Sequence, residues 1–314
     1  MKKWIVWFFV ILILGIAGIY VLIPAKIVIT NVSSAEATIT GEYRYISLED
    51  NWEKWWRDAD GKSHMKGEPF IFGKNEFWIS RRSYNAVGIT IRQDGVDIPG
   101  FLNLISYAID STGAVWVCEL PPTINPYIRL RNYINARDIK RNIAGVMRVF
   151  SEFISKPKNV YGMTIYKTTV HDTLIVSARF SSPEYPTTAQ LYGYFDTLKQ
   201  SIVKQKGLPV GFPIMNLRKM PDGSFETQTG MPTNRLLHND GKILALRMPP
   251  GLFITADITG GAYSVDEGMR QLELFVQEYN RVKIATGFQI LITDRRNEPD
   301  TTKWITKIKI PIVP

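Results

Sequence analysis

The sequence predicts an α+β protein in which an N-terminal transmembrane helix precedes two mixed domains. Three observations predict this class. The chain begins with a long uncharged apolar stretch, its middle holds strand-like segments that end in one long amphipathic helix, and an order of strand, helix, strand and strand occurs twice before the C-terminus. With 314 residues the chain has room for two domains, and apolar and charged fractions of 45% and 21% exclude wholesale disorder.

The apolar stretch runs from Trp4 to Ala25 without a charged residue. At 1.5 Å per residue such a helix is about 33 Å long, which is enough to cross the hydrocarbon core of a bilayer. A cleaved signal peptide is the alternative, but its apolar core is normally shorter, and Ile23-Pro24-Ala25-Lys26 is a poor cleavage site. We expect an uncleaved anchor in residues 1–26. Two lysines before the stretch and one after it favour a cytoplasmic N-terminus, with the soluble body on the outer (periplasmic or extracellular) side.

The middle of the chain is rich in predicted strands. The first is expected at Lys26–Ile39, and a tryptophan-rich run at Asn51–Asp58 indicates a short helix or turn. Four further strands are expected at Phe77–Ser80, Asn85–Gln93, Val96–Ile109 and Ala114–Leu120. Asp94-Gly95 is a strong hairpin signal between two of them. A long amphipathic helix follows, whose apolar face consists of Ile139, Ile143, Val146, Met147, Phe150 and Ile154.

This order of elements over residues 27–156 resembles the helix-grip fold of the START-like (SRPBCC, polyketide cyclase-like) superfamily. The resemblance implies an antiparallel sheet curled around the long helix to enclose a hydrophobic cavity. The tryptophan run resembles the W-x-x-W segment near the start of such domains. For Trp52, Trp55 and Trp56 we expect plain packing, with ligand contact as the alternative. The sole cysteine, Cys118, excludes an internal disulfide and is expected in the core rather than as a nucleophile.

The last sixty-odd residues read as strand, helix, strand, turn and strand. Leu252–Ile258 is the first strand, and Ser264 stands three residues before Glu267, the spacing of a capping box at a helix start. The helix is expected to turn Leu272, Phe275, Val276 and Tyr279 to one face. The strand Gly287–Ile292, the polar turn Asp294–Asp300 and the closing strand Trp304–Val313 follow.

A weaker copy of this order precedes it. Thr164–Phe180 carries a strand, and Pro186 opens a helix that ends at Gly207. The apolar face of that helix consists of Leu191, Phe195, Leu198 and Ile202. Gly211-Phe212-Pro213-Ile214 then matches Gly287-Phe288-Gln289-Ile290. We interpret residues 160–314 as two βαββ units, about 160–235 and 243–314, packed as a pseudo-dimer with a concave seam. The alternative is two unrelated α+β pieces.

This half resembles the GyrI-like, or AraC-type effector-binding, domain family, in which two such modules enclose an apolar pocket. The residues that carry the resemblance are Asp257–Tyr263, Phe288–Asp294 and Lys307–Ile312. The family usually has an acidic residue within a Trp-Glu-x-Tyr-like run on the pocket strand. Here Gln289 holds the acid position and Leu291 the aromatic one, so neither cation sensing nor hydrolysis follows from the resemblance.

Charge and motifs exclude several function classes. The net charge of +9 comes from an evenly spread excess of Lys and Arg, 38 against 29 acidic residues, with no recognition motif, so we expect no nucleic-acid partner. His64, His171 and His238 each stand alone, without the spacing of a metal site. The sequence also lacks a nucleophile elbow, a phosphate-binding loop and a dinucleotide fingerprint. We therefore expect no metal, no cofactor and no catalytic residue.

The remaining candidate chemistry is that of a ligand pocket in the seam. The polar-tipped or aromatic residues expected there are Tyr166, Tyr192, Tyr263, Phe288, Gln289 and Trp304. As a set they suit a small, mostly apolar and uncharged molecule, with Gln289 supplying a donor and acceptors. The sequence thus predicts a membrane-anchored binding or sensing protein. The alternatives are a hydrolase of small electrophiles and a non-catalytic envelope scaffold, and the oligomeric state stays open.

Overall fold

The protein divides into two compact units, one up to Lys156 and one from Pro157 on. This description rests on a computed structural model that describes residues 2–171, 173–248 and 250–313. Each unit contains one antiparallel sheet, with six strands in the first and eight in the second. The predicted α+β class and the apolar N-terminal helix are therefore confirmed.

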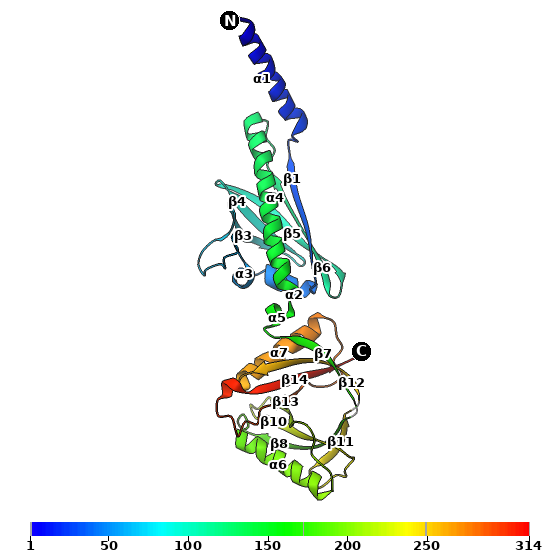
Figure 1. Cartoon of the computed structure of the whole chain (residues 1–314). Helices are drawn as coiled ribbons and strands as arrows, with labels where there is room; N and C mark the ends of the chain where they lie inside the picture. The colour runs from blue at the N-terminus through cyan, green and yellow to red at the C-terminus, as the bar shows by residue number, and fades with distance from the viewer. Residues whose placement is uncertain (1, 172, 249, 314) are drawn as a thin grey trace. The chain divides into compact units, whose positions relative to one another are not determined.

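Helix α1 (Lys2–Leu22) forms the start of the first unit (Figure 1). Its segment Trp4–Leu22 spans 19 residues with a mean hydropathy of 2.8, and none of the segment is buried against the rest of the protein. By length and composition this helix can cross a membrane, and a signal sequence near an N-terminus meets the same criteria.

The sheet of the first unit has the strand order β1-β6-β5-β4-β3-β2. Its elements are β1 (Ile27–Ala35), α2 (Ile39–Ile46), α3 (Glu49–Trp55), β2 (Phe70–Phe72), β3 (Asn75–Arg82), β4 (Ala86–Gln93), β5 (Val96–Ala108), β6 (Ser111–Leu120) and α4 (Pro126–Ile154). The expected strand Lys26–Ile39 is shorter than predicted, because the Thr38 hydroxyl accepts a hydrogen bond from the Gly41 amide and starts α2. The predicted hairpin at Asp94-Gly95 is confirmed, with φ angles of 49° and 76°.

Helix α4 packs on this sheet through the apolar face that its periodicity predicts. All six of the predicted face residues are buried, from Ile139 to Ile154. Trp52, Trp55 and Trp56 are at most 2% exposed and pack with one another and with Phe150. The tryptophans thus form core, as does Cys118, whose burial raises the pKa of its thiol to about 12.

The sheet of the second unit has the order β11-β8-β10-β9-β13-β14-β12-β7. Its elements are α5 (Pro157–Tyr161), β7 (Ile165–Val170), β8 (Thr173–Ser182), α6 (Thr188–Lys204), β9 (Ile214–Lys219), β10 (Phe225–Thr233), β11 (Leu244–Met248), β12 (Gly251–Thr259), α7 (Ala262–Glu278), β13 (Phe288–Leu291), the 3₁₀ turn η1 (Thr301–Lys303) and β14 (Ile305–Ile312). The single strand expected over Thr164–Phe180 is wrong. The segment forms β7 and β8, which belong to opposite ends of the sheet because β7 pairs with β12 and β8 pairs with β10 and β11.

This strand order is symmetric about its centre. Strands β9 and β13 meet in the middle, where Met215 lies opposite Gln289. Outward from there, β10, β8 and β11 on one side correspond to β14, β12 and β7 on the other. At the two edges of the sheet, β11 pairs with β8 and β7 pairs with β12.

Helices α6 and α7 cover one face of this sheet (Figure 1). The predicted face of α6 is confirmed, since Leu191, Phe195, Leu198 and Ile202 are all buried. The apolar cluster under α7 includes Leu272 and Val276, with Phe275 partly buried. Because side chains alternate along a strand, the residues between these core positions face away from both helices.

The helix starts differ from the prediction in two respects. Pro186 does not open α6, because Thr187 is the N-cap and the helix begins at Thr188. The capping box expected at Ser264 and Glu267 is wrong, because Gly261 is the N-cap of α7 and Glu267 instead pairs with Arg270 at 2.6 Å. Gly260, with a φ of 133°, turns the chain directly into the helix, so Ser264 already lies inside the first turn. A capping box is present at the start of α6, between Thr187 and Gln190.

Candidate functional site

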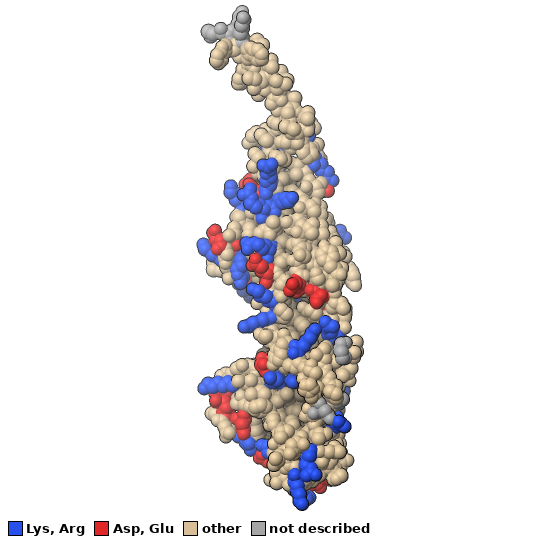
Figure 2. Space-filling view, turned by 45° about the vertical axis from the view of Figure 1, so that its right-hand side comes forward, with Lys and Arg blue, Asp and Glu red and all other residues tan. Residues whose placement is uncertain are grey.

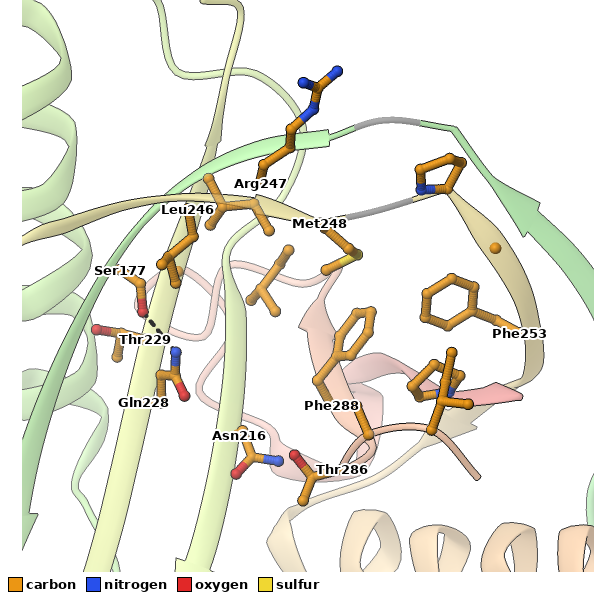
Figure 3. Close-up of a pocket in the computed structure, with 18 residues that line it drawn as sticks. Ser177, Asn216, Gln228, Thr229, Leu246, Arg247, Met248, Phe253, Thr286 and Phe288 are labelled. Carbon is orange, nitrogen blue, oxygen red and sulfur yellow. Dashed lines mark hydrogen bonds between the residues drawn. The ribbon is translucent and has the colours of Figure 1, made fainter. Parts of the chain in front are cut away.

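A cavity of about 380 Å³ lies on the face of the second sheet that the helices leave open (Figure 3). We call it the concave-face pocket. It is lined by Ile175, Ser177, Ile214, Asn216, Gln228, Thr229, Gly230, Leu246, Arg247, Met248, Pro250, Gly251, Phe253, Ile284, Ala285, Thr286, Phe288 and Pro311. Strand β11 at one edge of the sheet and β12 near the other both contribute. The sheet must therefore curve enough to bring its two ends to one cavity.

The pocket walls are largely apolar. The rings of Phe253 and Phe288 meet edge to face, with centroids 5.8 Å apart and planes 77° apart. Met248 lies beside them, and Leu246 stands on the same edge strand (Figure 3). Arg247, the one charged side chain among the described lining residues, extends away from the two rings. These walls suit a molecule with an apolar, flat body.

Gly230 on β10 helps to keep the cavity open. It lies opposite Ser177 of β8 and Ile214 of β9. A Cβ atom at this position would lie 3.1 Å from Ile175 Cγ2 and 3.6 Å from Ile214 Cβ. The absence of a side chain at Gly230 therefore leaves room between the strands that form the floor of the pocket.

Polar groups occupy one side of the pocket. The Gln228 amide donates a hydrogen bond to the Ser177 hydroxyl at 3.0 Å, and the Asn216 amide donates to the Gly287 carbonyl oxygen. Thr286 completes this side (Figure 3). Neutral donors and acceptors of this kind orient a bound molecule without requiring it to be charged.

A row of charged residues continues the same sheet face beside the pocket. Lys307 Nζ lies 3.6 Å from Asp257 Oδ1, and the Tyr166 hydroxyl donates to Asp257 Oδ2 at 2.7 Å. Burial, with a smaller contribution from Asp257, raises the pKa of Tyr166 to about 12. Lys309 lies nearer the pocket, and its Nζ is 5.7 Å from the centroid of the Phe253 ring.

A second recess of about 730 Å³ lies where α6 and α7 begin, and we call it the helix-start recess. Tyr185, Tyr263, Arg295 and Trp304 line it, with backbone and hydroxyl groups of the two helix starts. The Arg295 guanidinium lies 4.6 Å from the Trp304 ring centroid and donates to the Thr306 hydroxyl at 3.0 Å. Burial lowers the pKa of Arg295. The main aromatic surface of this recess is thus already covered by the protein's own cation, which leaves the concave-face pocket as the better apolar site.

The six residues expected in one seam do not line one pocket. Phe288 lines the concave-face pocket, whereas Tyr263 and Trp304 line the helix-start recess. Tyr166 lines neither of them, and its hydroxyl donates a hydrogen bond to Asp257.

Tyr192 and Gln289 lie inside the protein. The Tyr192 hydroxyl accepts from the Arg295 amide at 2.8 Å and donates to the Thr293 carbonyl at 3.3 Å, so it fastens the loop after β13. Gln289 alternates with Phe288 on β13 and therefore faces the helices, where it is 5% exposed. Its Oε1 is buried without a hydrogen-bond partner among the described residues.

Several pocket residues were not expected from the sequence, among them Ile175, Ile214, Met248 and Phe253. Period-two alternation assigns each of these residues to one of the two faces of a strand, but it does not say which face is open. Since β11 and β12 meet only through the curvature of an eight-stranded sheet, no local pattern reveals that they share a cavity. Among the described residues, no group of three or more His, Cys, Asp or Glu side chains is placed to hold a metal ion.

Comparisons with known proteins give only distant likenesses. No family model matches the sequence, and no curated protein matches it either. Among solved structures, the EcmrR C-terminal domain is 15% identical, with a TM-score of 0.40, over 48% of this chain and 97% of that one. SAV2435 bound to tetraphenylphosphonium is 14% identical, with a TM-score of 0.31, over 48% and 94%. A START superfamily protein from Mycobacterium smegmatis is 12% identical, with a TM-score of 0.25, over 39% and 98%. These TM-scores are low, and no functional residue of this chain follows from them.

Proposed function

We propose that this protein is a membrane-anchored receptor for a small, mostly apolar molecule, which binds in the concave-face pocket of the second unit. The observation that carries the proposal is the cavity of about 380 Å³ with apolar walls and a few neutral polar groups. Its volume lies within the range of ordinary small-molecule sites, about 300–1,000 Å³, and its composition is that of such a site.

The free energy of this pocket is expected to be lower when an apolar molecule fills it than when it is unfilled. The pocket is open to solvent, so its apolar walls face water as long as no molecule fills it, which is unfavourable. Filling it recovers about 0.8 kcal/mol for each buried methylene group. The Phe253 and Phe288 rings add an aromatic contact, which is worth about 0.5–1.5 kcal/mol beyond the buried area.

We further propose that the chain consists of an anchor at residues 1–26, a START-like domain at 27–156 and a GyrI-like effector-binding domain at 160–314. The symmetric strand order of the second sheet supports a duplication, with halves at about 160–235 and 243–314. The hydropathy of Trp4–Leu22 supports the anchor. The lysine distribution around it supports an outer location for both domains.

The binding function is tested by what co-purifies with the full chain. The protein is purified in lipid nanodiscs, extracted with organic solvent and compared by mass spectrometry with empty nanodiscs. Leu246→Trp fills the pocket from its edge, and Leu244→Trp is its matched control, since Leu244 stands on the same face of β11 but outside the pocket.

The proposal expects a stoichiometric apolar compound in the wild-type protein and in Leu244→Trp, and much less of it in Leu246→Trp. Equal amounts in both variants would place the compound elsewhere. Clean extracts, with no thermal shift across a panel of hydrophobic metabolites, would instead favour a scaffold.

A further inference from the structure

A row of charged residues lies beside the pocket on the open face of the second sheet. Alternate residues of β14 face the open side of the sheet, so Lys307, Lys309 and Pro311 lie in one line there. Pro311 lines the pocket and pairs with Phe253, while Lys309 pairs with Phe288 on one side and with Thr255 on the other. Lys309 is not one of the residues that line the pocket, but it lies next to both aromatic rings, Phe253 and Phe288.

Lys309 and Lys307 differ in their partners. Lys307 pairs with Asp257, whose second oxygen accepts from the Tyr166 hydroxyl, so this carboxylate is already engaged. For Lys309 the described part of the chain provides no carboxylate at ion-pair distance, and its Nζ instead lies over the Phe253 ring. A cation in this position has a favourable contact with the ring face but no carboxylate close enough for an ion pair among the described residues.

The surroundings of Lys309 leave its charge undercompensated. Burial lowers the pKa of Lys309, and repulsion from Lys307 lowers it further, while Asp257 opposes both. A bound anion would relieve this repulsion and restore the charged form. A bound cation would add to it.

Neutral hydroxyls accompany this lysine. Thr255, directly across from Lys309 on β12, shares a hydrogen bond of 2.7 Å with the Thr168 hydroxyl. The described lining of the pocket contains no acidic residue, so nothing within it would compensate a cationic ligand.

We propose that the concave-face pocket selects amphiphilic anions, molecules whose apolar body lies against Phe253 and Phe288 and whose carboxylate reaches Lys309. This inference rests on the proposed function and adds the class of ligand to it. Lys309 is a specificity residue, because it decides between an anionic and a cationic head group. The two rings supply affinity for the apolar body, whether the head group is anionic, neutral or cationic.

The test uses three probes that share a naphthyl body and differ only in head group: naphthylpropionate, naphthylpropanol and naphthylpropylamine. Each is titrated by calorimetry into the full chain in phosphatidylcholine nanodiscs, with empty nanodiscs as the blank. We expect the carboxylate to bind about tenfold more tightly than the alcohol, and the amine to bind more weakly than the alcohol.

Two variants and one control locate the effect. Lys309→Met keeps the apolar stem over Phe253, and it should bring carboxylate and alcohol to equal affinity. Lys309→Glu should reverse the order and favour the amine. Lys303→Gln removes an exposed lysine that pairs with Asp300 at 3.4 Å in η1, and it should leave the order unchanged.

The outcomes separate this inference from the proposed function. If the alcohol binds but the carboxylate has no advantage, or keeps it in Lys309→Met, anion selection is wrong and the apolar pocket stands. If none of the three probes binds, both proposals are wrong. An advantage that Lys303→Gln also abolishes would reflect the general positive charge of the protein and not Lys309.

Discussion

Replacing Phe288 by alanine removes one of the two rings that form the aromatic end of the pocket. A ring lying on a bound molecule covers about 50 Å², worth about 1.3 kcal/mol at about 25 cal/mol per Å². Loss of the aromatic contact adds about 0.5–1.5 kcal/mol. Together these predict that Phe288→Ala binds naphthylpropanol about 20- to 100-fold more weakly than the wild type.

Phe212 provides the matched control for this change. It stands in Gly211-Phe212-Pro213-Ile214, the stretch whose sequence matches Gly287-Phe288-Gln289-Ile290, but it is 49% exposed and does not line the pocket. Phe212→Ala should therefore leave the dissociation constant unchanged. Both variants are titrated by calorimetry in nanodiscs, and thermal unfolding confirms that each is folded. Equal affinities in the two variants would refute the assignment of the pocket.

Three further predictions concern the fold. Thr187→Ala should lower the free energy of unfolding by about 1 kcal/mol through loss of the α6 cap, whereas Ser264→Ala should have little effect. Thermal unfolding compares the two variants, and an equal loss of stability would contradict the helix starts described above. Burial raises the pKa of Glu42 to about 7, so the native state binds more protons than the unfolded state between its ordinary value and that pKa. Stability should fall as pH rises through this range, and Glu42→Gln should raise the melting temperature at pH 8 but not at pH 4; a pH-independent change would be contrary evidence. Cys118 should resist maleimide in the native protein at pH 8 and react after unfolding, and rapid native labelling would show that the thiol is accessible.

Sequence periodicity predicts much of this fold because local geometry sets it. The face of α4 follows from the spacing of Ile139 to Ile154, and the hairpin between β4 and β5 follows from the positive φ that Asp94-Gly95 accepts. The helix α6 and the closing strand β14 are likewise where their patterns place them.

Features that depend on tertiary structure are harder to predict from the sequence. Strands β7 and β8 stand at opposite ends of the strand order, although both come from a segment that reads as one strand. The start of α7 is decided by Gly260-Gly261 rather than by the Ser264 side chain. Both depend on where the chain must go next, which no local spacing encodes.

The pocket, too, could be predicted from the sequence only in part. Phe288 could be proposed because it lies on a strand after a helix, but its neighbour Gln289 faces the opposite side of the sheet. Alternation guarantees that only one of the two lines a given face, without saying which one. The contribution of Lys309 follows only from the pairing of β14 with β12 and β13.

The position of a bound molecule tests the central claim most directly. A bromonaphthyl carboxylate is soaked into crystals of the full chain, and its bromine is located by anomalous scattering. We expect the peak against Phe253 and Phe288, with the carboxylate toward Lys309. A peak in the recess beside Tyr263 and Trp304, or the absence of any peak in the second unit at full soaking concentration, would contradict the account.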